Sequence, residues 1–169
     1  MPVSEGERDK MTDSQQYITF YARGQLFGID IMETREIVNL KETTEMPNAP
    51  EFVEGIVDLR GEIVPVIMLD KRLTLTNNRE NSIQENEKRV IIVSLQDNLI
   101  GLEVDEVEGI ISLNSSNIEE APELARGINS NFVRGVGKHS DKLVIILNLD
   151  KILTIEEMKQ IEKTMDLDG

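Results

Sequence analysis

Short apolar runs separated by turn residues dominate the chain from about residue 17 onward. Two of these runs, 17–21 and 26–31, lie on either side of Gly24 and are rich in strand-forming residues, which predicts a β-hairpin. Further strands are predicted at 53–59, 63–69, 90–95, 99–104, 107–113 and 143–149. Because short strands at this spacing are typical of barrels and sandwiches, the pattern predicts a mainly β fold.

Three segments depart from the strand pattern. Residues 1–15 contain little that a core could bury, which predicts a flexible N-terminal arm. The polar stretch 74–88 predicts a loop or hinge. At 154–169 we expect a C-terminal helix and tail, because Thr154 and Glu157 form a capping box and apolar residues recur at helical spacing, namely Ile155, Met158, Ile161 and Met165.

An internal repeat relates the two halves of the chain. Residues 52–73 align with residues 132–153 at a shift of 80, and 26–31 align with 99–104 at a shift of 73. Chance similarity between β-rich segments is the alternative, but the matches are collinear and include Asp-Lys at one position. The identical pairs are Phe52/Phe132, Val53/Val133, Gly55/Gly135, Val64/Val144, Leu69/Leu149, Asp70/Asp150, Lys71/Lys151, Leu73/Leu153, Leu26/Leu99 and Gly28/Gly101.

The repeat predicts two related small barrels in tandem within one domain, residues 16–153. We expect the barrels to span about 16–88 and 89–153, either as successive units or interlocked. Each barrel alone would have a marginal core, so the two are expected to share an interface.

Charge and composition narrow the range of partners. The chain carries 32 acidic and 18 basic residues, a formal net charge of −14, which disfavours nucleic acid and anionic membranes and favours a basic protein partner. It has no cysteine, which excludes disulfides and thiolate sites. No apolar run approaches the ~20 residues of a membrane span, and the polar N-terminus does not resemble a signal peptide, so we expect a cytoplasmic location.

Candidate catalytic residues are few. His139 is the single histidine and lies in a polar turn beside Ser140 and Asp141, and residues adjacent in a loop rarely form a triad. Acidic pairs such as Asp105-Glu106 and Glu156-Glu157 fit a solvated strand face and a first helical turn. We therefore expect a protein that is not an enzyme, with no catalytic residue, metal or cofactor. A small metal-dependent hydrolase using acidic residues is the alternative from another class.

The segment 52–66 reads as two strands around a tight turn at Arg60-Gly61. An arginine at a loop tip between rigid strands is well placed to bind a carboxylate or stack on an aromatic ring. The competing interpretation is a local pair with Asp58 or Glu62. The matching turn of the second half, 138–141, keeps neither the arginine nor the glycine, which indicates that barrel packing does not require them.

Several segments together resemble the CheW family of bacterial chemotaxis coupling proteins. The central motif is the run 47–66, with its two prolines, a Phe-Val-x-Gly strand, an Asp-Leu-Arg-Gly turn and an Ile-Val-Pro strand. Residues 27–31, 36–37, 101–105 and 132–135 resemble other family segments, so that the resemblance covers about 16–165. Asp58 departs from the family, which usually has Asn there, and adds a negative charge beside Arg60.

This resemblance implies two five-stranded, SH3-like barrels with short helices and a C-terminal helix. It implies an adaptor that links methyl-accepting chemoreceptors to the histidine kinase CheA and is recruited to membrane receptor arrays through the receptor, without inserting into the membrane. An adaptor or regulatory module of a non-chemotaxis kinase pathway is the alternative. Kinase-binding residues are not assigned. The receptor-binding residues carried over are Glu36, Ile37, Gly55, Arg60 and Gly61, with Thr34, Ile56 and Val57 as weaker candidates.

Overall fold

The computed structural model describes residues 14–40, 42–75, 88–120 and 128–168. Its strands are β1 (Ser14–Ala22), β2 (Gln25–Asp30), β3 (Thr34–Asn39), β4 (Val53–Leu59), β5 (Glu62–Met68), β6 (Arg89–Leu95), β7 (Asn98–Val104), β8 (Glu106–Asn114), β9 (Ile118–Glu119), β10 (Val133–His139) and β11 (Lys142–Leu147). The α-helices are α2 (Leu69–Arg72) and α3 (Ile155–Asp168), and short 3-10 turns are η1 (Ile31–Glu33), η3 (Ser115–Asn117), η5 (Ser130–Phe132) and η6 (Leu149–Lys151).

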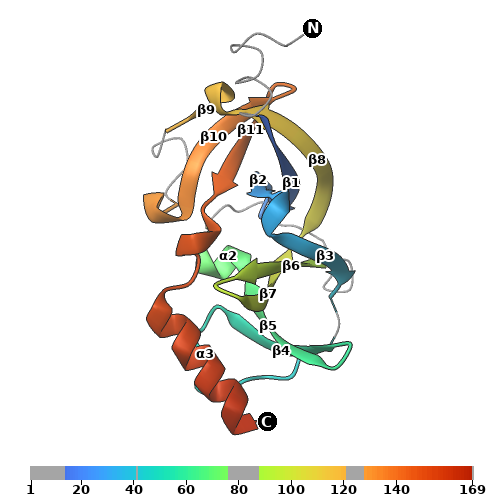
Figure 1. Cartoon of the computed structure of the whole chain (residues 1–169), viewed down its shortest axis with the longest axis vertical. Coiled ribbons are helices and arrows are strands. Elements are labelled where there is room, and N and C mark those ends of the chain that lie inside the picture. Colours follow the sequence, from blue (N-terminus) through green and yellow to red (C-terminus); the bar gives the residue numbers. More distant parts are fainter. Residues whose placement is uncertain (1–13, 41, 76–87, 121–127, 169) are drawn as a thin grey trace, which may run out of the picture.

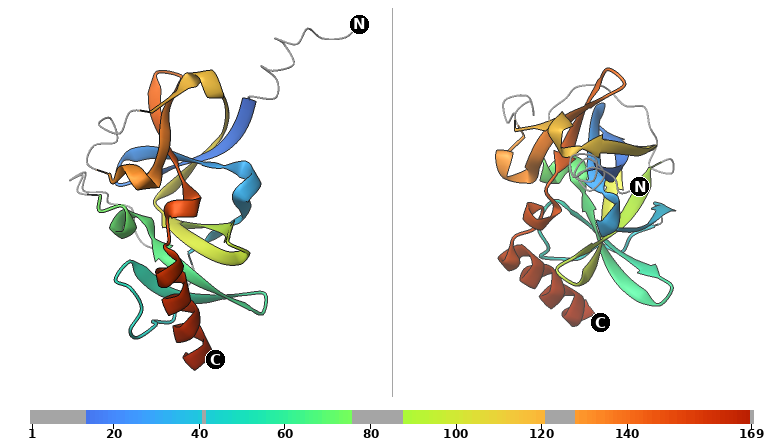
Figure 2. Two further views of the ribbon diagram at one scale, coloured as in Figure 1. Left: turned by 60° about the vertical axis from the view of Figure 1, so that its left-hand side comes forward. Right: turned by 45° about the horizontal axis from the view of Figure 1, so that its top comes forward.

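The strands form two curled sheets stacked one above the other (Figure 1). The sheet that we call the terminal barrel has the order β8-β1-β2-β11-β10-β9, and the central barrel has the order β3-β6-β7-β5-β4. The mainly β fold with SH3-like barrels is thus confirmed, with five strands in one sheet and six in the other when the two-residue β9 is counted. In both views of Figure 2, helix α3 lies beside the central barrel.

The sheets do not divide at residue 88. The central barrel is continuous in sequence from β3 to β7, across that residue, and it is inserted between strands β2 and β8 of the terminal barrel. The boundary predicted at about residue 88 therefore needs correction, and of the two arrangements considered the interlocked one describes the sheets. The physical reason is that each repeat gives its first two strands to the sheet of the other repeat, where they find their pairing partners.

The repeat is visible in the strand pairing. Hairpin β4–β5 pairs Gly55 with Val66, and hairpin β10–β11 pairs Gly135 with Ile146, each with an irregularity just before the glycine. Each hairpin then adds a parallel strand from the other repeat: β5 pairs with β7, and β11 pairs with β2. The shifts of 80 and 73 seen in the sequence therefore correspond to equivalent places in two like-built sheets.

The core has three parts. Small clusters fill the two barrels, one around Val64 and Val66 and the other around Val144 and Ile146. A much larger cluster takes residues from both sheets and from α3, among them Phe20, Phe27, Ile91, Leu102, Leu147 and Ile161. The expected shared interface between the barrels is thus confirmed, and most of the buried apolar surface lies there.

Three segments were expected to lie outside the strand pattern: the N-terminal arm, the polar loop and the C-terminal helix. The predicted arm, 1–15, mostly lies outside the described residues, but Ser14 and Gln15 begin β1 and pair with β8, because ladder pairing needs no apolar side chain. Most of the predicted 74–88 loop also lies outside them. The capping box of α3 is confirmed: the backbone N–H of Thr154 donates to Glu157 Oε1 at 2.9 Å, and that of Glu157 donates to Thr154 Oγ1 at 3.0 Å.

Candidate protein-docking site

The turn between β4 and β5 is a tight hairpin held by its own side chains. Arg60 and Gly61 both have positive φ, 52° and 89°, as the central residues of a type I′ turn require. The backbone N–H of Gly61 donates to Asp58 Oδ1 at 2.8 Å. Asp58 therefore acts as the turn's acceptor, a task that an Asn side-chain oxygen can also perform.

Arg60 reaches across the mouth of the central barrel. Its Nη2 donates to Glu36 Oε2 on β3, and this hydrogen bond together with the negative charge raises the pKa of Arg60. Strands β3 and β4 are the two edges of the sheet, so the ion pair joins the edges that the curl brings together. Of the two interpretations of Arg60, the local pair with Asp58 or Glu62 is not the ion pair that forms; Arg60 pairs with Glu36 on another strand. With its side chain 73% exposed, Arg60 remains available to a partner.

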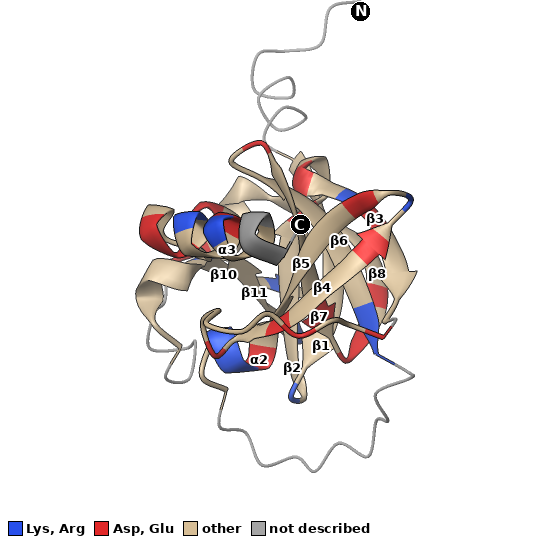
Figure 3. Ribbon diagram, turned by 90° about the horizontal axis from the view of Figure 1, so that it is seen from below, with Lys and Arg blue, Asp and Glu red and all other residues tan. Residues whose placement is uncertain are grey.

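A shallow hollow of about 390 Å³ lies beside this ion pair. It is lined by Arg35, Glu36, Leu59, Arg60, Glu62, Ile92 and Leu99. Glu36 is part-buried, whereas Asp58 and Glu62 are exposed. Figure 3, a view from below, shows acidic positions in red on strands of the central barrel. The surface thus combines one exposed guanidinium with surrounding carboxylates.

The predicted receptor-binding residues share one barrel but differ in exposure. Glu36, Ile37 and Thr34 lie on β3, and Ile37 is 40% exposed. On β4, Ile56 is half-buried and Val57 is a core residue at 8% exposure. The structure therefore brings Glu36, Arg60 and Gly61 together at the surface and turns Val57 inward.

Gly55 has a packing role. It is buried, and a Cβ at this position would lie 2.4 Å from the carbonyl oxygen of Thr44. Thr44 forms an isolated antiparallel bridge with Ile56, with two backbone hydrogen bonds of 2.9 and 2.8 Å. Gly55 thus allows the segment around Thr44 to cover the edge strand, and it offers no side chain to a partner.

The comparisons with known proteins agree with this geometry. A family model described as a CheW-like domain matches residues 16–157. The chain belongs to the CheW family. It is 31% identical over 146 residues to the chemotaxis protein CheW of Treponema pallidum, covering 86% of each chain. With CheW of Klebsiella aerogenes it shares 30% identity over 152 residues, or 89% of each chain. The crystal structure of the scaffolding protein TtCheW from Thermoanaerobacter tengcongensis matches with a TM-score of 0.75 and 34% identity, covering 85% of this chain and 90% of that one.

Family membership confirms the predicted resemblance, and with it the assignment as a chemotaxis adaptor. His139 is exposed at the end of β10, and no three His, Asp or Glu residues in the described ranges are grouped as a metal site would need. None of the helices described is long and apolar enough to cross a membrane.

The terminal barrel also exposes large apolar residues that the sequence pattern did not single out. Ile110 and Leu143, on β8 and β11 of the terminal barrel, are 58% and 50% exposed. They occupy the repeat positions of Ile37 and Ile63, which are 40% and 47% exposed. The repeat shift of 73 residues relates Ile37 to Ile110, and the shift of 80 relates Ile63 to Leu143. A comparison of apolar residues at these shifts would have identified both pairs from the sequence.

The terminal barrel keeps the turn geometry but changes its chemistry. Ser140 and Asp141, at the repeat positions of Arg60 and Gly61, also have positive φ, 49° and 64°. Here the cation is Lys142, whose Nζ donates to Tyr21 Oη at 3.1 Å and lies 3.5 Å from Glu108 Oε1; these contacts raise its pKa. Because the backbone of Ser140 and Asp141 has the same positive φ without an arginine, the turn itself does not require Arg60.

Proposed function

We propose that this protein links methyl-accepting chemoreceptors to the histidine kinase CheA by binding both, without catalysing a reaction. The receptor tip would contact the central barrel around Arg60, Glu36 and Ile37, with Gly61 leaving the turn open. The observation that carries the proposal is an exposed guanidinium held at the barrel mouth by a long-range ion pair with Glu36, the residue before exposed Ile37 on β3. Such a mixture of one arginine and apolar surface is typical of binding hot spots.

The kinase would dock on a different face, so that both partners bind at once. Exposed Ile110 and Leu143 on the terminal barrel support that face, because they repeat the exposed apolar positions Ile37 and Ile63 of the central barrel. Receptor state would then pass to the kinase as a coupling free energy between the two interfaces, typically ~1–3 kcal/mol. The protein itself would stay in the cytoplasm and reach membrane arrays through the receptor.

Charge reversal at the turn tests the receptor contact. Arg60→Glu removes the guanidinium and places a carboxylate beside Glu36, so we expect affinity for a receptor signalling-tip fragment to fall by at least about tenfold. Lys138→Glu is the matched control, because it makes the same charge change on an exposed strand of the terminal barrel. Binding is measured by isothermal titration calorimetry, with thermal melting to check folding. Wild-type affinity in a folded Arg60→Glu variant would refute the assignment of Arg60.

A further inference from the structure

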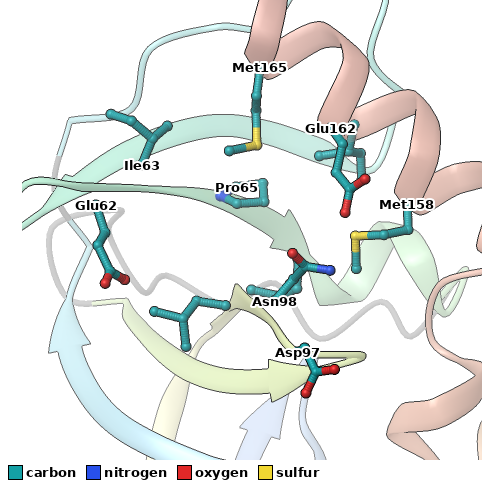
Figure 4. Close-up of a pocket in the computed structure, with 11 residues that line it drawn as sticks. Glu62, Ile63, Pro65, Asp97, Asn98, Met158, Glu162 and Met165 are labelled. Carbon is teal, nitrogen blue, oxygen red and sulfur yellow. The ribbon is translucent and has the colours of Figure 1, made fainter. Parts of the chain in front are cut away.

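A groove separates helix α3 from the central barrel. Its volume is about 440 Å³ (Figure 4). One wall comes from strand β5 and from the turn and start of β7, and the other comes from α3. It adjoins the hollow beside Arg60, with which it shares Glu62 and Leu99, but it opens along the helix.

Most lining residues are apolar in type, but Met158 and Ile161 are buried, so the exposed apolar surface comes from Ile63 and from part-buried Leu99 and Met165. Ile63, Pro65 and Leu99 come from the barrel, and Met158, Ile161 and Met165 come from one face of α3. Figure 4 shows the Met158 and Met165 side chains directed from the helix toward the barrel. Ile63 is 47% exposed, so apolar surface stays in contact with water at one end. Methionine side chains are flexible and polarisable, which lets such a lining adapt to different apolar side chains.

The rim of the groove is acidic. Glu62, Asp97 and Glu162 are among the lining residues and are exposed, and the lining contains no Lys or Arg. The polar group in the middle is Asn98, whose amide can both donate and accept hydrogen bonds (Figure 4). Because the chain as a whole carries a net charge of −14, the surrounding field adds to the negative potential at this rim.

The helical wall is fixed in place before any partner arrives. Glu157 closes the capping box and also accepts two hydrogen bonds from Arg72, at 2.9 and 2.7 Å. One turn further along, Gln160 Nε2 donates to the backbone oxygen of Asn48 at 2.8 Å. A preformed groove binds without the free-energy cost of ordering its own walls.

From these observations we propose that the groove binds a short basic amphipathic segment of a partner protein, with apolar side chains against the methionines and Lys or Arg at the three carboxylates. Charge complementarity selects this occupant. Nucleic acid and anionic lipid carry the same sign as the rim, and a second copy of this chain would bring another net charge of −14. The proposal does not depend on the receptor contact at Arg60.

The test uses a panel of fluorescein-labelled dodecapeptides that place Leu and Lys at helical or alternating spacing, with Glu replacing Lys in the matched controls. Fluorescence polarisation measures affinity, and methyl NMR of the full chain with labelled methionine reports the place of binding. We expect Lys peptides to bind and to shift the Met158 and Met165 methyl signals, while Met32, which is 85% exposed and not in the lining, stays unchanged.

Two charge variants of α3 separate groove binding from general attraction. Glu162→Lys should lower the affinity for the Lys peptides about tenfold, and Glu162→Gln should lower it by less. Glu156→Lys makes the same charge change on an exposed helix residue outside the lining and should alter affinity less than about twofold. Any of four results would overturn the proposal. No Lys peptide binds, or the Glu peptides bind equally well. Both Lys variants lose the same affinity, or the methyl signals that shift are not those of Met158 and Met165. Arg60→Glu should leave peptide binding intact, so failure at the receptor contact stays distinguishable.

Discussion

Replacement of Arg72 by alanine would remove the contacts that join α2, α3 and both barrels. The Arg72 guanidinium lies 4.5 Å from the ring centre of Phe52 and 4.8 Å from that of Phe132, two residues related by the repeat. Its Nε donates to the backbone oxygen of Ile152 at 2.6 Å, and its two terminal nitrogens donate to Glu157. The side chain is 13% exposed, so solvent screens these interactions only weakly.

The size of the effect follows from these contacts. Hydrogen bonds to charged groups contribute ~1.5–3 kcal/mol, and a cation over an aromatic ring contributes ~0.5–1 kcal/mol or more when desolvated. Since the contacts share one side chain and are not additive, we expect Arg72→Ala to lower the free energy of unfolding by about 3–4 kcal/mol. Arg72→Lys keeps the charge but loses the planar fork, and should cost about half as much.

Urea denaturation followed by circular dichroism measures the change. Arg23→Ala is the control, because Arg23 pairs with Asp70 at 3.1 Å but their side chains are 48% and 25% exposed, so its loss should cost less than about 1 kcal/mol. If Arg72→Ala cost no more than Arg23→Ala, the reasoning about this buried contact set would be wrong.

Three further predictions concern single positions. Gly55→Ala should destabilise the protein by about 2 kcal/mol or more, because the new Cβ meets the Thr44 oxygen at 2.4 Å; urea denaturation checks this, and an unchanged midpoint would contradict it. Asp58→Asn keeps the acceptor for the Gly61 N–H and should change the melting temperature by less than about 2 °C, whereas Asp58→Ala should lower it more. Burial is the main cause that raises the pKa of Glu33. The folded state therefore disfavours the ionised carboxylate, and the free energy of unfolding falls as the pH rises through the raised pKa. Glu33→Gln should therefore raise the melting temperature at pH 7 by about 1–2 °C and lose that gain below about pH 4; a gain that persists in acid would exclude ionisation as its cause.

Much of the fold could be predicted from local patterns. The hairpin at 17–31, the strands around Arg60 and the capping box at Thr154 all depend on residues close in sequence, whose spacing alone sets the structure. Strand β3 was missed: at 34–39 its exposed and part-buried residues alternate, so no continuous apolar run marks it. The exchange of strands between the two repeats could not be predicted from the sequence pattern either. Matching segments show that two strands are equivalent, but they do not show whether a strand pairs within its own repeat or with the other repeat.

The candidate site shows the same limit. A turn with an exposed arginine was predictable from Leu-Arg-Gly between two strands, but its ion pair with Glu36 joins the two sheet edges and depends on the curl of the barrel. The burial of Gly55 and Val57 likewise follows from tertiary packing, in particular from the segment around Thr44 that covers β4. The residues carried over from the family motif therefore divide into those exposed at the surface, such as Arg60, and those buried beneath it, such as Gly55 and Val57.

As an adaptor, the protein must hold two partners at once, one on each barrel. Co-sedimentation tests this directly: purified CheA is mixed with receptor-containing membranes, with or without this protein, and the pelleted kinase is measured. We predict that the protein raises the amount of pelleted kinase several-fold and that Arg60→Glu abolishes most of the increase. Lys159→Glu, which makes the same charge change on an exposed residue of α3 away from both proposed faces, should not. An amount of pelleted kinase that is the same with and without the protein would contradict the account.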